Sequence, residues 1–165
     1  MVNTFYIIII FICIQRLIEL IYSNYNTKKL LNKGAKEYYK GHYPLFIILH
    51  SSWIASLVIF ISPNSSINHT LLLIFILLQF LRLWVLLSLG QYWTTRIIRL
   101  HGSKLIKKGL YKWFKHPNYI IVFFELLILP LIFGSWIIAI IFTIFNSLLL
   151  LYRISLENKV LDNEI

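Results

Sequence analysis

The stretch GLYKWFKHPNY, residues 109–119, is a polar and aromatic island between two long apolar regions of the chain. It carries His116 directly before Pro117, and a proline is favoured in the first turn of a helix, where no backbone donor is needed. We therefore predict that a helix begins here and that the free amides of its first turn are available to an anion. Gly109 permits close approach of the backbone to a ligand.

Composition places the chain in a membrane. Of its 165 residues, 59% are hydrophobic and 13% are charged, and a soluble domain of this size cannot bury so much apolar surface. The net charge of +10 lies in short segments that flank apolar runs, which argues against a nucleic-acid partner. The single cysteine, Cys13, excludes an internal disulfide, and no Cys/His spacing is typical of a metal site.

Five apolar stretches predict membrane-spanning helices. They are residues 4–22, 43–62, 69–90, 119–133 and 136–152. The fourth is short, contains Pro130, and is followed by a predicted tight hairpin at 134–135. The expected fold is an all-α integral membrane protein with five transmembrane helices in a single domain, residues 1–165.

The distribution of Lys and Arg predicts the orientation. These residues are concentrated in 23–42 and 91–118, whereas the connections 63–68 and 134–135 carry none. By the positive-inside rule the two basic segments face the cytoplasm, which puts the N-terminus outside and the C-terminus inside. Residues 91–118, a loop before the fourth helix, and residues 153–165 are then cytoplasmic elements.

One polar residue of each predicted helix lies at a similar depth. Counted from the cytoplasmic ends at about 1.5 Å per residue, these residues lie roughly 9 to 12 Å into the membrane. They are Arg16, His50, Arg82, Glu125 and Asn146. A buried charge costs several kcal/mol unless it is paired or hydrated. Arg82 and Glu125 have no opposite charge three or four residues away, so we predict a polar chamber open to the cytoplasm.

A structural network is an equally good interpretation for the other polar residues at this depth. Arg16 and Glu19 can pair locally at i,i+3, while His50 and Asn146 can bond to neighbouring helices. Beyond the last apolar run, Arg153 and Glu157 share one helix face at i,i+4. They form either an exposed ion pair or part of the chamber mouth.

Membrane contact explains part of the basic loop. Attraction to anionic headgroups accounts for Lys104, Lys107 and Lys108. An aromatic belt at the interface accounts for Tyr111, Trp113, Phe114 and Tyr119. Neither explanation accounts for His116 and Pro117.

Residues 109–119 resemble the Gly-Pro-Tyr-Arg-x-x-Arg-His-Pro-x-Tyr signature of the isoprenylcysteine carboxyl methyltransferase family, integral membrane enzymes that use S-adenosylmethionine. The likeness extends upstream to Arg82, Gly90, Trp93 and Thr94, and downstream to RISLE at 153–157, which is similar to the family's Arg-x-x-x-Glu-Glu element.

The first half of the chain is similar to the small bacterial branch of this family. The similar segments are QRLIEL at 15–20, GAKEY at 34–38 and HYP at 42–44. Members of the branch include enzymes that methylate long-chain alkylpyrones made by type III polyketide synthases. The resemblance implies a bacterial cell membrane protein whose active site faces the cytoplasm.

The chain departs from the family pattern at three positions. Leu110 replaces a proline, Lys115 an arginine and Asn158 the second glutamate. Lys115 keeps the charge but lacks the bidentate fork of arginine. Any role that needs two adjacent carboxylates cannot be carried over to this chain.

The resemblance implies roles for seven residues. Four of them hold the cofactor at the start of the fourth helix: Tyr111, His116, Pro117 and Tyr119. Arg153 and Glu157 belong to the catalytic machinery and close the pocket, and Glu157 also contacts the cofactor. Arg82 is a catalytic residue that reaches the acceptor group.

The implied reaction is O-methylation of a lipophilic small molecule. Transfer from a sulfonium is an in-line displacement, so the protein mainly aligns the partners and excludes water. A carboxylate or an acidic enol, as in an alkylpyrone, is ionised at neutral pH and needs no general base. A neutral hydroxyl would need one, with Glu125, Glu157 or His116 as candidates.

Other function classes stay open. One is a related-fold enzyme, either a phospholipid-amine methyltransferase or an NADPH-dependent membrane reductase. The other is a membrane scaffold or transporter, although no internal repeat is visible in the five predicted spans. In every case membrane lipids are partners, and the sequence does not determine the oligomeric state.

Overall fold

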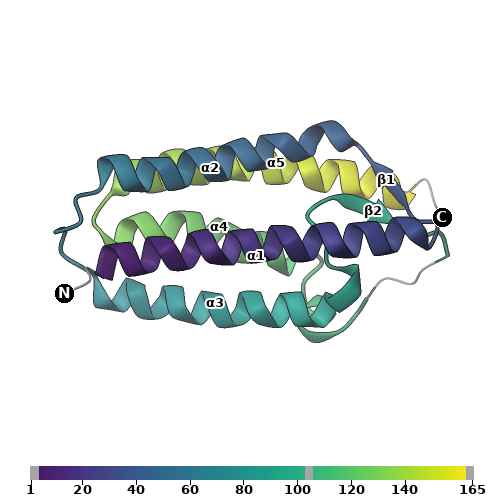
Figure 1. The fold of residues 1–165 in the computed structure, drawn as a ribbon, viewed down its shortest axis with the longest axis horizontal. Coiled ribbons are helices and arrows are strands. Elements are labelled where there is room, and N and C mark those ends of the chain that lie inside the picture. The colour runs from purple at the N-terminus through teal and green to yellow at the C-terminus, as the bar shows by residue number, and fades with distance from the viewer. Residues whose placement is uncertain (1–3, 103–105, 163–165) are drawn as a thin grey trace.

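The computed structural model describes residues 4–102 and 106–162, and its five helices run alongside one another as an elongated bundle (Figure 1). They are α1 (Thr4–Asn32), α2 (Tyr43–Phe60), α3 (His69–Leu89), α4 (Pro117–Ile132) and α5 (Trp136–Asp162). Four are long and apolar enough to cross a membrane, and α4 is a shorter apolar helix. The prediction of five apolar helices, the fourth of them short, is confirmed.

Local sequence explains where the helices start and stop. Asn68 caps α3, because its Oδ1 accepts a hydrogen bond from Leu71 N over 3.1 Å. Pro117 occupies the first turn of α4, directly after His116. Between α4 and α5, Gly134 adopts φ +73°, a left-handed conformation that glycine tolerates and that closes the predicted hairpin.

The core lies where α4 packs between α3 and α5. Trp53 and Leu57 of α2 meet Leu126 and Leu129 of α4 there, and all four are fully buried. The outward surfaces stay apolar, as with Phe60, which is 74% exposed. An apolar exterior around an apolar core is what a bilayer requires.

The first helix is longer than predicted. It continues ten residues beyond the expected end of the span, to Asn32, because its polar residues are satisfied by the segment after α3. Asn26 Nδ2 donates to the carbonyl oxygens of Gly90 and Trp93 over 3.1 and 2.9 Å. Ser23 Oγ lies 2.8 Å from the hydroxyl of Thr95.

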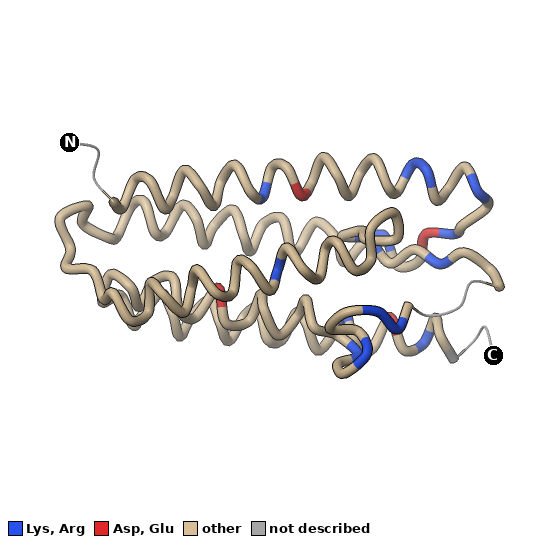
Figure 2. Tube along the Cα trace, turned by 90° about the horizontal axis from the view of Figure 1, so that it is seen from below, with Lys and Arg blue, Asp and Glu red and all other residues tan. Residues whose placement is uncertain are grey.

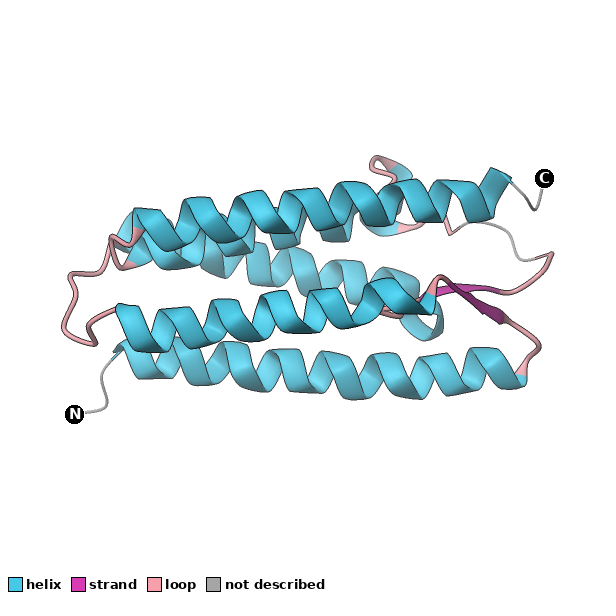
Figure 3. Cartoon of the chain, turned by 90° about the horizontal axis from the view of Figure 1, so that it is seen from above, coloured by secondary structure: helices cyan, strands magenta, loops and turns pink. Residues whose placement is uncertain are grey.

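The fold is not wholly helical. Strand β1 (Lys36–Tyr38) pairs antiparallel with β2 (Ile97–Arg99), with Glu37 opposite Ile98. The two strands lie beside the ends of α1 and α5 (Figure 3). They tie together the two basic segments that the sequence placed on one side of the membrane.

Positive charge gathers at the same end of the bundle. Figure 2 shows most of the Lys and Arg residues near the end where the C-terminus lies. The connections at the other end, 63–68 and 134–135, carry none. This asymmetry fits the predicted orientation, which itself stays a prediction.

Candidate active site

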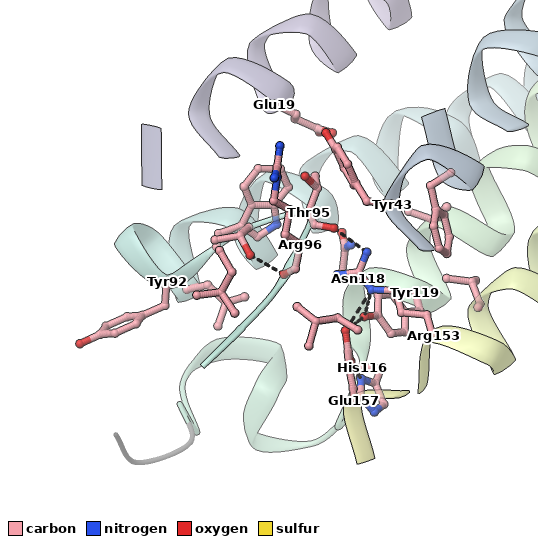
Figure 4. Close-up of a pocket in the computed structure, with 18 of the residues that line it drawn as sticks. Glu19, Tyr43, Tyr92, Thr95, Arg96, His116, Asn118, Tyr119, Arg153 and Glu157 are labelled. Carbon is pink, nitrogen blue, oxygen red and sulfur yellow. Dashed lines mark hydrogen bonds and ion pairs between the residues drawn. The ribbon is translucent and has the colours of Figure 1, made fainter. Parts of the chain in front are cut away.

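A cavity of about 860 Å³ opens at the basic end and reaches into the bundle. Its walls come from α1, α2, the end of α3, the segment before α4, and the last turns of α5 (Figure 4). Five residues with predicted cofactor or catalytic roles line its outer part: Tyr111, His116, Tyr119, Arg153 and Glu157. Residues from α4, α5 and the segment before α4 are thus brought to one site.

Arg153 holds this outer part together. Its Nε donates to Tyr119 Oη over 2.8 Å and to Glu157 Oε1 over 3.0 Å, and its Nη1 donates to the carbonyl oxygen of Thr95 over 2.7 Å. Tyr119 Oη also donates to Glu157. The i,i+4 pair expected from spacing is therefore one edge of a network that joins three elements, not an isolated surface pair.

His116 lies against this network. Its ring stacks on Tyr119, with centroids 5.1 Å apart and planes 5° from parallel, and Nδ1 lies 3.5 Å from Glu157 Oε2. Burial lowers the pKa of His116, assisted by Lys115 and Arg153 and opposed by Glu157. A neutral imidazole with its proton on Nδ1, toward the carboxylate, leaves Nε2 as an acceptor.

Four buried polar atoms of residues that line the cavity have no hydrogen-bond partner within the described residues. Two are Arg16 Nε and Arg96 Nε, and the other two, His116 Nε2 and Asn118 Oδ1, lie in the outer part. Tyr111 lies on the same wall, where burial raises the pKa of its hydroxyl, so it is a neutral donor. Pro117 does not line the cavity, but it is buried at the helix start and fixes the direction in which its neighbours point.

The inner part of the cavity ends at a cluster of four charges. Arg16 and Glu19 come from α1, Arg82 from α3 and Glu125 from α4. Arg82 Nη1 donates to Glu125 Oε2 over 2.7 Å, and its Nε and Nη2 donate to the two oxygens of Glu19. Arg16 Nη2 donates to Glu125 Oε2 over 2.7 Å. Arg16, Glu19 and Arg82 line the cavity, whereas Glu125 lies behind them.

Three of the five residues predicted at one depth, Arg16, Arg82 and Glu125, thus meet in one network. The local pairing of Arg16 with Glu19 is present at 3.5 Å, but both residues also bond to other helices. His50 lines the cavity and donates from Nδ1 to the Phe46 carbonyl over 2.9 Å. Asn146 is fully buried, lies apart from the cavity, and has no partner for its amide among residues 4–102 and 106–162.

Sequence reasoning missed several residues of the site. Asn118 occupies the variable position between His-Pro and Tyr, where the motif gives no signal. Thr95 contributes a backbone carbonyl, which no sequence pattern reveals. Arg96 forms an ion pair with Glu37 at 3.1 Å and lies over the Tyr43 ring. The sequence did not single out Arg96, because it is one of many basic residues in this segment and precedes a strand that is too short to detect.

Comparison with known proteins identifies the family of the chain. The model of the isoprenylcysteine carboxyl methyltransferase (ICMT) family matches residues 70–163. The uncharacterized protein YpbQ of Bacillus subtilis (strain 168) is 37% identical over 162 residues, covering 96% of each chain. An uncharacterized protein of Haemophilus influenzae is 32% identical over 120 residues, 69% of this chain and 70% of its own. No solved structure matches. The chain belongs to the isoprenylcysteine carboxyl methyltransferase family of membrane methyltransferases.

Proposed function

We propose that the protein transfers a methyl group from S-adenosylmethionine to an anionic oxygen of a lipophilic acceptor, a carboxylate or an acidic enol such as that of an alkylpyrone. The observation that carries this proposal is the form of the cavity. A single space joins a polar outer part, which has open hydrogen-bonding groups, to an inner part that has apolar walls and ends at the charge cluster. A soluble cofactor and a lipid can therefore meet there.

The outer residues fit the cofactor. S-adenosylmethionine carries an amino acid group, a ribose and an adenine ring, which need acceptors, donors and an aromatic surface. Asn118 Oδ1 and His116 Nε2 are buried acceptors without a partner in the described chain, and Glu157 supplies negative charge. The stacked rings of His116 and Tyr119 supply the aromatic surface. We assign Tyr111 and Arg153 as further donors at this site.

The inner walls fit a lipid chain. Leu17 and Leu20 of α1 face the space that Ile47 and Ile54 of α2 also line. Helices α1 and α2 pack against each other less closely than α4 packs against α3 and α5. An acceptor held in the bilayer can therefore extend its chain between these two helices, where apolar burial stabilises it.

The chain's own residues position the reactants and exclude water. When bound, the cofactor supplies an activated methyl group on its sulfonium. Arg153, Tyr119 and Glu157 restrain one another, so the outer site is rigid before the acceptor arrives. Arg16 and Arg82 place guanidinium donors at the inner end for the acceptor, and Glu19 and Glu125 balance their charge. An acceptor that is already ionised needs no general base, and Glu125 is committed to two arginines.

The basic end of the bundle supports a cytoplasmic active site. S-adenosylmethionine is a soluble metabolite, and the Lys-rich mouth is the end that the positive-inside rule assigns to the cytoplasm. The proposal is tested by incubating purified protein with methyl-labelled S-adenosylmethionine and a long-chain 4-hydroxy-6-alkyl-2-pyrone in vesicles. We expect label in the lipid fraction with wild-type protein and its loss with Glu157→Gln. Wild-type protein that labels neither this pyrone nor a bacterial lipid extract would contradict the proposal.

A further inference from the structure

Two arginines lie at the inner end of the cavity, and their surroundings differ. Arg82 is held by both carboxylates of the cluster through Nε, Nη1 and Nη2, and only 4% of its side chain is exposed. Arg16 also contacts both carboxylates, but one of these contacts is long, at 3.5 Å. Its side chain is 15% exposed. Of the two, Arg16 is the less enclosed and the less firmly held.

Arg16 also retains an unused donor. Its Nε is buried, and none of the described residues offers it a hydrogen-bond partner. A buried guanidinium N–H without an acceptor is costly, so such a group is commonly matched by a ligand or an ordered water. The residue lines the cavity, so an acceptor of hydrogen bonds that is bound there lies next to the Arg16 side chain.

The charges around Arg16 allow an anion to bind at this residue. Two arginines and two glutamates cancel within the cluster, so it has no excess negative charge to repel an anion. An anion at Arg16 needs to displace only the 3.5 Å contact with Glu19, since Glu19 keeps Arg82 on both of its oxygens. Glu125 still holds Arg16 Nη2 at 2.7 Å and fixes the direction of the side chain.

The cavity next to Arg16 is shaped for an amphiphile. Cys13 and Leu20 lie about one turn to either side of Arg16 on α1, and both line the cavity. His50 and Ile54 of α2 line it as well. A ligand whose anionic group binds Arg16 can therefore place an alkyl chain against these apolar side chains. A free inorganic anion would make no use of them.

We propose that Arg16 is the residue that receives the anionic group of the acceptor, and that Arg82 is a positioning residue that keeps Glu19 and Glu125 in place behind it. This inference rests on the proposed methyltransferase function, because it names the part of the same cavity that selects the acceptor. It also specifies the acceptor class as a single-headed anionic amphiphile, in preference to its neutral analogue.

Binding without turnover tests the inference. The probes are a long-chain 4-hydroxy-6-alkyl-2-pyrone, ionised at pH 7.5, and its neutral 4-methoxy analogue with the same chain. Each is titrated calorimetrically into protein in nanodiscs of uncharged lipid. We expect wild-type protein to bind the enolate about 10- to 100-fold more tightly, as a charge-assisted hydrogen bond permits. Arg16→Gln should bind the two probes almost equally.

Gln15→Ala is the matched control. Gln15 donates to Glu19 Oε1 over 3.2 Å, so this variant disturbs the same cluster without touching the cavity wall. It should discriminate like wild-type protein. If Arg16→Gln does not fold, Arg16→Lys takes its place, because it keeps the charge but loses the guanidinium Nε and should lose most of the discrimination.

The outcomes separate this inference from the proposed function. S-adenosylhomocysteine is titrated into the same samples. Discrimination that survives in the Arg16 variants, or is missing in wild-type protein, overturns the inference even when S-adenosylhomocysteine binds. Arg16-dependent discrimination in a protein that does not bind S-adenosylhomocysteine would instead contradict the methyltransferase proposal.

Discussion

Lys115 Nζ donates a hydrogen bond to Asn158 Oδ1 over 2.6 Å, which joins the segment before α4 to the end of α5. These residues are two of the three positions at which the chain departs from the family pattern, where an arginine and a glutamate are usual. The two departures face each other, so they form one paired change. A hydrogen bond from an ammonium to an amide stands where the family pattern has an arginine and a glutamate.

This pairing predicts the effect of restoring the acid. Asn158→Glu should stabilise the folded protein by up to about 1 kcal/mol, because an exposed ion pair contributes about that much at most. A double-mutant cycle of Lys115→Ala and Asn158→Ala, followed by thermal unfolding in detergent, should give a coupling of a few tenths of a kcal/mol or more. Lys112→Ala is the control, since its ammonium lies over the Trp113 ring. Equal coupling of Asn158 to Lys112 and Lys115 would argue against the pairing.

Gly109 should tolerate no side chain. It adopts φ +57°, and a Cβ there would lie 2.1 Å from Ser88 Oγ and 3.1 Å from Trp84 Nε1 of α3. Gly109→Ala should therefore displace the turn that carries Tyr111, lower the melting temperature, and weaken binding of S-adenosylhomocysteine. Adding Ser88→Ala should remove the clash but leave the backbone strain of about 1 kcal/mol.

Gly41→Ala is the matched control for Gly109. Nothing lies within 4 Å of a Cβ at that position. Both variants are measured by thermal unfolding and by S-adenosylhomocysteine titration. A Gly109→Ala protein that behaves like Gly41→Ala would show that the contact with α3 does not shape the site.

Removing Glu125 should destabilise the bundle. Glu125→Ala leaves Arg16 and Arg82 with only Glu19 to balance them inside the bundle, and breaking a buried ion network in this way costs about 3 to 5 kcal/mol. Thermal unfolding in detergent should show a fall on the order of 10 °C. Glu37→Gln breaks the Arg96 pair, in which Arg96 is 32% and Glu37 6% exposed. This change should cost less, because Arg96 is partly hydrated and glutamine keeps a hydrogen-bond acceptor for it. Equal losses of stability in Glu125→Ala and Glu37→Gln would contradict the larger contribution assigned to the Glu125 network.

Stability should depend on the protonation of His116. Its pKa is lowered in the folded protein, so as the pH falls through about 6.5, the ordinary value, the unfolded chain binds the proton first. The free energy of unfolding therefore decreases below about pH 6.5 and levels off below the folded pKa. His116→Gln should remove this part of the decrease. The melting temperatures of both proteins are measured from pH 8 to pH 5. An equal fall in the two proteins would contradict this role of His116.

The helices could be predicted because a bilayer leaves few choices. Long apolar runs must form helices to satisfy their own backbone, and the constant rise per residue makes depth countable. That count placed Arg16, Arg82 and Glu125 at one level, where they meet. It could not show which of them bond, because this depends on how each helix is rotated. Arg82 and Glu125 were expected to face a chamber, and they bond to each other at 2.7 Å.

The basic end of the bundle was harder to predict because its order comes from distant contacts. Ser23 and Asn26 read as loop residues, yet they continue α1 since the segment after α3 satisfies them. Strands of three residues carry too short a pattern to be detected. Asn118 reaches the site because it lies in the first turn of α4, and Thr95 contributes only its backbone carbonyl. A single sequence reveals neither contribution.

Calorimetric titration with S-adenosylhomocysteine tests the central claim most directly. The claim is that the outer part of the cavity, built on His116 and Arg153, is a cofactor site. Wild-type protein should bind one equivalent, and Arg153→Lys should bind about 10- to 100-fold more weakly, because lysine cannot make the three hydrogen bonds of Arg153. His116→Ala should abolish binding while the protein stays folded. Undiminished binding by folded His116→Ala would contradict the account.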